Sequence, residues 1–136
     1  MILWDFLGPE TDGSRENLIQ RWARKEKLSN RDRGHLNSKL DFLEQMGFDL
    51  AHGNRTIVGP VNKQRHIYKL VVHGDVMLRP MLCKGPPESR SGEMTLLEGA
   101  IEKGWKLHPA DAAERAERNR LEIERDCHRR GSHERF

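Results

Sequence analysis

The stretch of sequence that decides the fold is residues 67–82, which read IYKLVVHGDVMLRPML. Aliphatic and β-branched residues fill both ends, and His73-Gly74-Asp75 lies between them. Two extended runs joined by so short a turn predict an antiparallel hairpin with strands over 67–72 and 76–82. Because Pro80 has no N–H to donate, we expect the second strand to lie at a sheet edge or to be irregular there.

Further extended segments are expected on both sides of this hairpin. Thr56-Ile57-Val58 precedes it, and residues 94–101 follow it after a loop at 85–92 that is rich in Gly, Pro and Ser. At the start of the chain, the alternation of Ile2, Trp4 and Phe6 with their neighbours predicts a short strand that ends at a Gly-Pro turn. These segments supply the strands of a small sheet.

Helical spacing fills the interval between the first strand and the hairpin. Ser14 can cap a helix that runs to about Leu28, and Ser29 starts a capping-box pattern for a second helix that Gly47 can end. With so short a connection, we expect a helical hairpin that covers one face of the sheet. The apolar residues assigned to its core side are Leu18, Trp22, Leu36, Leu40 and Leu43.

A last helix is expected after Pro109, with a weak apolar stripe of alanines that ends at Ile123. Residues 127–136 lack periodicity, and we expect a frayed or disordered tail there. The chain therefore predicts one domain over residues 1–126. Its class is α+β, with an N-terminal strand and helical hairpin packed on a small antiparallel sheet, and a C-terminal helix.

The composition indicates a lean globular domain without a membrane segment. The 136 residues are 33% charged and 35% hydrophobic, with a mean hydropathy of −0.83, so the core must be small. No apolar run approaches the length of about eighteen residues that a membrane span needs. Asp5 interrupts the start of the chain, unlike a signal sequence, and we expect a cytoplasmic protein with Cys83 and Cys127 reduced.

Positive charge is concentrated in the middle of the sequence. Residues 55–109 carry 9 Lys/Arg against 5 Asp/Glu, a surplus of four. Residues 1–54 carry 8 against 9, and residues 110–136 carry 7 against 7. This distribution is what a segment facing a polyanion would show, and a solvated sheet face explains it equally well.

Three segments match motifs of a known family. Residues 28–50 look like a helical hairpin of that family, and residues 66–72 followed by Leu78-Arg79 look like its two hairpin strands. Residues 96–103, with Lys106 and Pro109 behind them, are similar to its Leu-Leu-His-Gly-Phe-x-Lys-Lys segment. With these motifs the chain resembles the RelE/ParE toxin superfamily, and among its members most of all the phage-derived HigB-like toxins.

The chain also departs from the family pattern. Glu98 stands where the family has His, and Glu102 stands for the first Lys, so two expected polar or basic groups are missing. Leu78 replaces a Tyr that commonly precedes the Arg, and Val71 or Val72 replaces an Arg.

The resemblance implies a toxin of a type II toxin-antitoxin system that cleaves messenger RNA on the ribosome without a metal. It implies mRNA, the ribosome and a cognate antitoxin as partners, and we expect a monomer when the protein is free. Two alternatives stay open: a non-catalytic, phage-derived structural or nucleic-acid-binding protein with the same fold, and a gyrase inhibitor of the ParE type.

The resemblance carries over Lys69, Arg79, Lys103 and Lys106 as candidate site residues. Arg79 is the strongest, because a guanidinium can clamp phosphate bidentately. The basic middle segment adds further candidates, since a histidine can act as acid or base near neutrality, an aromatic ring can stack on a base and basic side chains can contact phosphate. The candidates for catalysis are Arg79, Lys69, Lys103 and His66, and those for RNA binding are Arg65, Lys84, Trp105 and Lys106. His73 and His108 could also replace a missing group, although a turn residue and a helix-capping residue are simpler interpretations. No spacing indicates a metal site, and no cofactor is expected.

Overall fold

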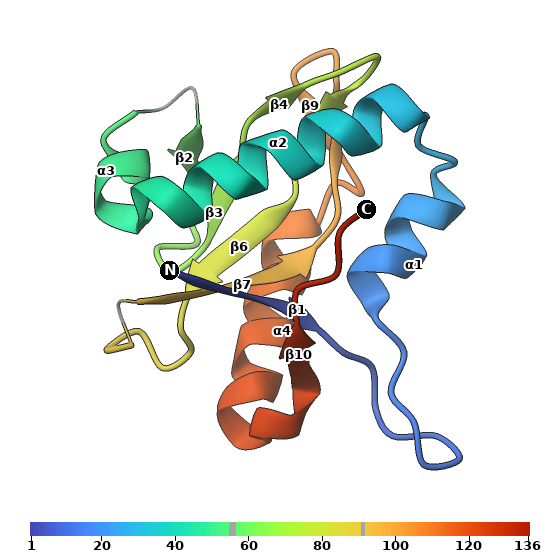
Figure 1. Cartoon of the computed structure of the whole chain (residues 1–136), viewed down its shortest axis with the longest axis vertical. Coiled ribbons are helices and arrows are strands. Elements are labelled where there is room, and N and C mark those ends of the chain that lie inside the picture. Colours follow the sequence, from blue (N-terminus) through green and yellow to red (C-terminus); the bar gives the residue numbers. More distant parts are fainter. Residues whose placement is uncertain (55–56, 91) are drawn as a thin grey trace.

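The computed structural model describes residues 1–54, 57–90 and 92–136, which form a mixed α+β architecture (Figure 1). The α-helices of this part of the chain are α1 (Leu18–Lys25), α2 (Asn30–Met46), α3 (Phe48–His52) and α4 (Ala112–Arg125). The larger sheet contains β1 (Ile2–Phe6), β2 (Val58–Pro60), β3 (Tyr68–Leu70), β6 (Met81–Lys84), β7 (Glu93–Glu98) and β10 (Arg130–Ser132). The smaller sheet contains β4 (Val72–His73), β5 (Met77–Leu78), β8 (Ile101–Lys103) and β9 (Lys106–His108). The α+β class predicted from the sequence is confirmed.

Strand order places the two ends of the chain next to each other. The larger sheet has the order β10-β1-β7-β6-β3-β2 and the smaller one β4-β5-β8-β9. In the larger sheet, β1 and β7 pair in parallel and all other strand pairs are antiparallel. The sequence predicted a purely antiparallel sheet, and the observed larger sheet is mixed. Thr56, predicted in a strand, and Ser91, predicted in a loop, lie outside the described residues.

The hairpin predicted over 67–82 is confirmed, because β3 pairs with β6 and β4 pairs with β5, both antiparallel. The chain passes from one sheet to the other at Val71 and again at Arg79-Pro80. Pro80 does mark an irregularity, since the register of β6 against β7 shifts between Met81 and Leu82. It does not mark an edge, because β6 lies between β3 and β7.

Local capping explains where the helices begin. The Ser29 hydroxyl accepts the N–H of Asp32 at 3.1 Å, as the capping-box pattern predicts, and Gly47 ends α2 with φ +81°. The first helix starts later than expected. Asn17 caps it, not Ser14, and its Oδ1 accepts the N–H groups of residues 19 and 20 at 3.0 Å each. The short helix α3 was not predicted.

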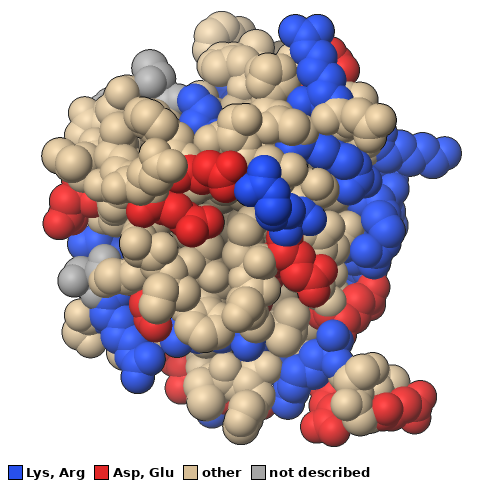
Figure 2. Space-filling model, viewed as in Figure 1, with Lys and Arg blue, Asp and Glu red and all other residues tan. Residues whose placement is uncertain are grey.

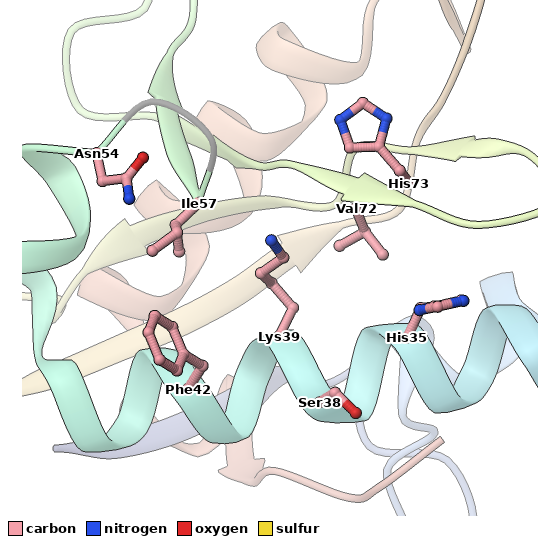
Figure 3. Close-up of a pocket in the computed structure, with 8 residues that line it drawn as sticks. All are labelled: His35, Ser38, Lys39, Phe42, Asn54, Ile57, Val72 and His73. Atoms are coloured by element: carbon pink, nitrogen blue, oxygen red, sulfur yellow. The ribbon is translucent and has the colours of Figure 1, made fainter.

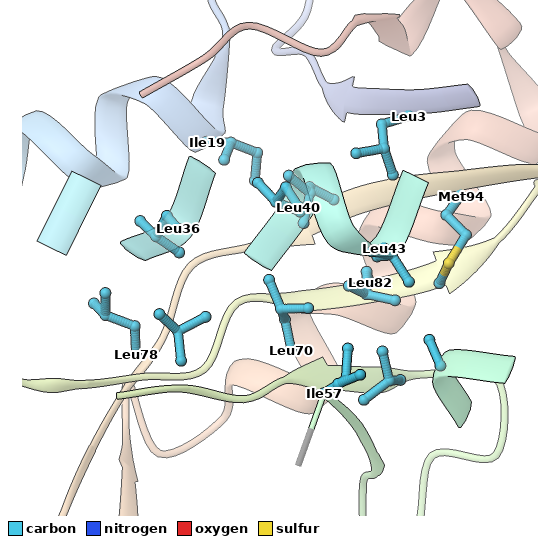
Figure 4. Packing of buried hydrophobic residues seen from close by; sticks show 14 of the residues in the cluster. Leu3, Ile19, Leu36, Leu40, Leu43, Ile57, Leu70, Leu78, Leu82 and Met94 are labelled. Carbon is cyan, nitrogen blue, oxygen red and sulfur yellow. The ribbon is translucent and has the colours of Figure 1, made fainter. Parts of the chain in front are cut away.

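Two apolar cores lie on opposite faces of the sheet. Leu36, Leu40 and Leu43 of α2 point toward the strands that carry Leu70 and Leu82, as Figure 4 shows. On the other face, Ala112 and Ala116 of α4 pack in one cluster with Met81 and Cys83 of β6 and Leu97 of β7. Burial in this second core raises the pKa of the Cys83 thiol to about 12, so this thiol stays protonated and unreactive.

The tail is not frayed as expected. Residues 130–132 form β10, which pairs antiparallel with β1 at the sheet edge. The fully buried carboxylate of Asp5 holds the segment that follows: Oδ2 accepts the Glu134 N–H at 2.9 Å, and Oδ1 lies 2.8 Å from Nδ1 of His133. The chain then ends between α1 and α2, where the Phe136 N–H donates to Asn37 (Figure 1).

No helix in the described ranges is long and apolar enough to cross a membrane. Within the same ranges, no group of three or more His, Cys, Asp and Glu side chains could hold a metal ion.

The Asp5 cluster generates a prediction about stability. Asp5→Ala removes an acceptor from three donors, including Asn17 Nδ2 at 2.8 Å. Leaving such groups buried and unpaired is expected to cost about 3 kcal/mol of unfolding free energy. Urea denaturation measures the loss, with the exposed Glu10→Ala as control. Equal midpoints for the two variants would contradict the structural role of Asp5.

Candidate nucleic-acid interface

The β8–β9 hairpin ends in a two-residue turn with an unusual composition. Lys103 pairs with Lys106, which leaves Gly104-Trp105 as the turn. Both turn residues have positive φ, +55° and +68°, as a type I′ turn requires. Gly adopts this conformation freely, whereas a residue with a Cβ pays about 1–2 kcal/mol. A tryptophan here is therefore not explained by the stability of the turn.

Trp105 is also the most exposed large apolar side chain among the described residues, at 95% exposure. Lys103 and Lys106 are exposed on either side of it. We call these three residues the hairpin tip. The structure therefore brings three of the residues predicted from the sequence onto one exposed hairpin end, an aromatic side chain and two lysines.

A second basic surface follows α1. Residues 15–33 carry 7 Lys/Arg against 3 Asp/Glu. Figure 2 shows blue side chains gathered over the α1 side of the molecule and more of them at the top, where the β8–β9 hairpin projects in Figure 1. The charge count of the sequence missed this surface, because acidic residues elsewhere in the first 54 positions cancel it.

A pocket joins α1 to the base of the hairpin. Its volume is about 320 Å³, and it is lined by residues of α1, β7, the end of β9 and α4. The residues that line it are Leu18, Ile19, Arg21, Trp22, Lys25, Glu26, Leu97, Glu98, His108, Pro109, Arg115 and Asn119. We call it the Glu98 pocket. His108 is the last residue of β9, so the pocket lies directly behind the hairpin tip along that strand.

Glu98 lines this pocket with a carboxyl group whose pKa is raised. Burial raises the pKa of the Glu98 carboxyl above its ordinary value, and the positive charge of Arg115 opposes this shift without cancelling it. The backbone N–H of Gly99 and the charge of Arg21 also lower this pKa, whereas the charge of Asp111 raises it. A carboxyl group with a raised pKa can exchange protons closer to neutrality than an exposed one.

Close packing fixes the wall beneath Glu98. Gly99 lies so near the Trp22 ring that a Cβ at this position would overlap the ring atoms. Trp22 is 9% exposed, and its buried Nε1–H has no acceptor among the described residues. Asn119 of α4 donates to the carbonyl of Leu97 at 2.7 Å. Glu98 is thus presented from a rigid strand between two fixed helices.

The sequence predicted that Arg79 would bind phosphate, but its side chain is buried in the structure. It is 6% exposed and donates to the carbonyls of Leu78 at 2.9 Å and Val72 at 3.3 Å. Its Nη2 lies 3.5 Å from Oε2 of Glu102. Any phosphate that approached this guanidinium would compete with the Glu102 carboxylate.

Two further candidates pack against neighbours on the larger sheet. Lys84 lies over the Phe48 ring at 4.6 Å, with its Nζ 4.0 Å from Asp49. Lys69 is half-buried in β3, where its alkyl chain covers Gly59.

The last two candidates lie next to α4. Nδ1 of His66 is 3.1 Å from Glu88, and Arg65 is exposed beside it. The hydrogen bond from Arg120 lowers the pKa of Glu117, and the charges of His66 and Arg65 add to the effect. In the described part of the chain, no contact joins either residue to the hairpin tip.

A separate cavity of about 460 Å³ lies between α2 and β4 (Figure 3). Lys39 points into it between Phe42 and Val72, and His35 and His73 flank one end. His73, interpreted as a turn residue, belongs to β4 and approaches the Met77 sulfur at 3.0 Å. Of these lining residues the sequence offered only His73, as a possible replacement for a missing group, and the cavity shares no lining residue with the Glu98 pocket.

Comparison of the chain with protein-family models, with curated proteins and with solved structures found no match.

The strained turn generates a prediction that separates packing from exposure. Trp105→Gly is expected to raise the unfolding free energy by about 1 kcal/mol, because glycine adopts positive φ without a Cβ clash. Trp22→Ala, which removes a buried ring, is expected to lower it by about 3 kcal/mol or more. Thermal and urea unfolding measure both changes. A similar loss in the two variants would mean that Trp105 packs against the domain.

Proposed function

We propose that this protein binds single-stranded RNA across the hairpin tip and the basic surface of α1. The observation that carries the proposal is Trp105, which is held in a strained turn at 95% exposure between two lysines. An aromatic face with no protein neighbour can stack on an unpaired base, and stacking of this kind is typical of proteins that bind single strands.

Charge supports the same proposal. Lys103 and Lys106 are exposed and flank the turn that carries the aromatic ring, so their ammonium groups can reach phosphates on either side of a stacked base. Arg21 and Arg24 of α1 share the carboxylate of Glu16, at 3.3 and 3.8 Å, and the three side chains are about half-exposed. Exposed ion pairs of this kind are weak, so they can exchange for phosphate contacts.

Membership of the RelE/ParE superfamily is part of the proposal. Its support is the set of motifs in the sequence together with the order of the elements: a strand, two helices, antiparallel strands and a last helix. Messenger RNA on the ribosome would then be the substrate, and an antitoxin encoded nearby would be the inhibitor. The gyrase-inhibitor alternative has no feature of the described residues in its favour.

Metal-independent cleavage of the bound RNA is the second candidate function. It is favoured by the Glu98 pocket, in which a carboxylate, a histidine and arginines lie behind the hairpin tip. Arg79 is paired with Glu102, which disfavours a role for Arg79 in cleavage. Around Arg79, the alternative of a non-catalytic nucleic-acid-binding protein therefore stays open.

Binding is tested with a fluorescently labelled, unstructured RNA oligonucleotide and anisotropy titrations at several salt concentrations. Trp105→Ala is expected to weaken binding by about 1–3 kcal/mol, which is the range for one stacked base. The double variant Lys103→Ala, Lys106→Ala is expected to reduce the slope of log K against log salt by about 1.4.

The control is Phe42→Ala, which removes another exposed aromatic ring from the surface of α2. It should bind like the unmodified protein. If the hairpin-tip variants also bind unchanged, the RNA interface is elsewhere; if the unmodified protein does not bind single-stranded RNA at all, the proposed function fails.

A further inference from the structure

We propose that the cavity between α2 and β4 binds a nucleoside monophosphate, and we call it the nucleotide cavity. Its walls are a stripe of α2 from His35 to Phe42 and the strand residues Val72 and His73 (Figure 3). None of its described lining residues belongs to the hairpin tip or to the Glu98 pocket. The inference therefore goes beyond the RNA-binding proposal and stands apart from it.

The packing of α2 fixes one wall of the nucleotide cavity. Residues 35, 38, 39 and 42 recur at helical spacing and form one stripe of the helix. The neighbouring stripe, which contains Leu36, Leu40 and Leu43, is buried in the core. Because the core stripe anchors the helix, the stripe beside it is held in a constant position over the buried side chain of Val72.

The charges along the nucleotide cavity favour an anion. Lys39 points into it between Phe42 and Val72, and His35 and His73 flank one end (Figure 3). Helix α2 also carries acidic residues, but they lie off this stripe: Asp32, Asp41 and Glu44. Among the described lining residues, none is acidic. A phosphate group next to Lys39 and the two imidazoles would meet only donors and positive charge.

The turn beside the histidine end adds a further cation. Nε of Arg31 donates to Nε2 of His35 at 3.5 Å, and its Nη1 lies 3.4 Å from Asp75 in an exposed ion pair. Exposed pairs of this kind are weak, so the guanidinium can turn toward a phosphate. The carboxylates of the turn are already bound, since Asp32 accepts the Asp75 N–H at 2.6 Å and Asp75 accepts the Ser29 hydroxyl at 2.8 Å.

The opposite end of the nucleotide cavity suits a flat ring. Phe42 lies there with Ile57, away from the two histidines (Figure 3). The Phe42 ring is 47% exposed, so a base placed against it would cover apolar surface that the fold leaves open. The volume of about 460 Å³ lies within the range of small-molecule sites. A ring at one end and a phosphate at the other are the two recognition groups of a nucleoside monophosphate.

Isothermal titration calorimetry on the full chain tests the proposal with AMP, GMP, CMP and UMP titrated singly. At least one of them is expected to bind. Its nucleoside and inorganic phosphate, titrated separately, should each bind weaker by about tenfold or more, because each lacks one of the two groups.

Two variants locate the binding. Lys39→Met keeps the alkyl chain without the charge and is expected to weaken binding by about tenfold or more. Phe42→Ala is expected to weaken it by about two- to tenfold. The matched controls are Lys25→Met, an exposed helical lysine outside the cavity, and Trp105→Ala at the hairpin tip, and both should bind like the unmodified protein. Circular dichroism verifies that each variant is folded.

A second readout needs no variant. In NMR spectra of the unmodified protein, the imidazole resonances of His35 and His73 are expected to shift when the nucleotide is added. Those of His108 and His128, which do not line the cavity, should stay in place. Saturating nucleotide should also leave the affinity for labelled RNA unchanged.

The outcomes separate this inference from the proposed function. Binding that both cavity variants weaken, with shifts at His35 and His73, supports the nucleotide cavity whether or not RNA binds. No binding of any of the four nucleotides overturns it. It is also overturned if inorganic phosphate or the nucleoside binds as tightly as the nucleotide, or if only the control variants lose binding. Failure of RNA binding alone would remove the proposed function and leave this inference standing.

Discussion

The buried carboxylate of Asp5 is the interaction on which the arrangement of the molecule depends. It accepts the side-chain N–H of Asn17, and Asn17 is also the residue that caps α1. It also holds the tail through the Glu134 N–H. One side chain therefore fixes the start of α1, the edge strand β10 and β1 relative to one another. Since α1 supplies a wall of the Glu98 pocket, the geometry of the candidate site is tied to this cluster.

The crossing between the two sheets explains why Arg79, the strongest site candidate predicted from the sequence, is buried and bound to backbone carbonyls. The chain changes sheets at Arg79-Pro80, where the regular hydrogen-bond ladder is interrupted. The Arg79 guanidinium donates to two carbonyls at this crossing and is balanced by Glu102. Buried carbonyls need such donors, and a buried guanidinium needs a partner charge. The same property that makes arginine a good phosphate ligand makes it a good bridge between sheets.

The candidate interface combines a rigid pocket with a projecting hairpin. The side chains behind the tip belong to regular elements, and the packing of Gly99 against Trp22 holds β7 close to α1. The tip itself is strained and solvent-exposed. A recognition element that reaches outward, supported by a site fixed in the fold, is an arrangement suited to capturing a flexible strand before any chemistry takes place.

The sequence by itself determined the elements that depend on neighbours in the chain. The hairpin of 67–82, the Ser29 cap and the apolar stripe of α2 follow from turn chemistry, capping and helical period, all of which act within a few residues. It also indicated Lys103 and Lys106 through the resemblance and Trp105 as an aromatic in the basic segment, whereas the two-residue turn that joins them is a finding of the structure. Only the tertiary structure decided that the tail is ordered, that Arg79 is buried and that His108 and Glu98 line one pocket. The tail depends on Asp5, 129 positions from Glu134, and such contacts have no local signal.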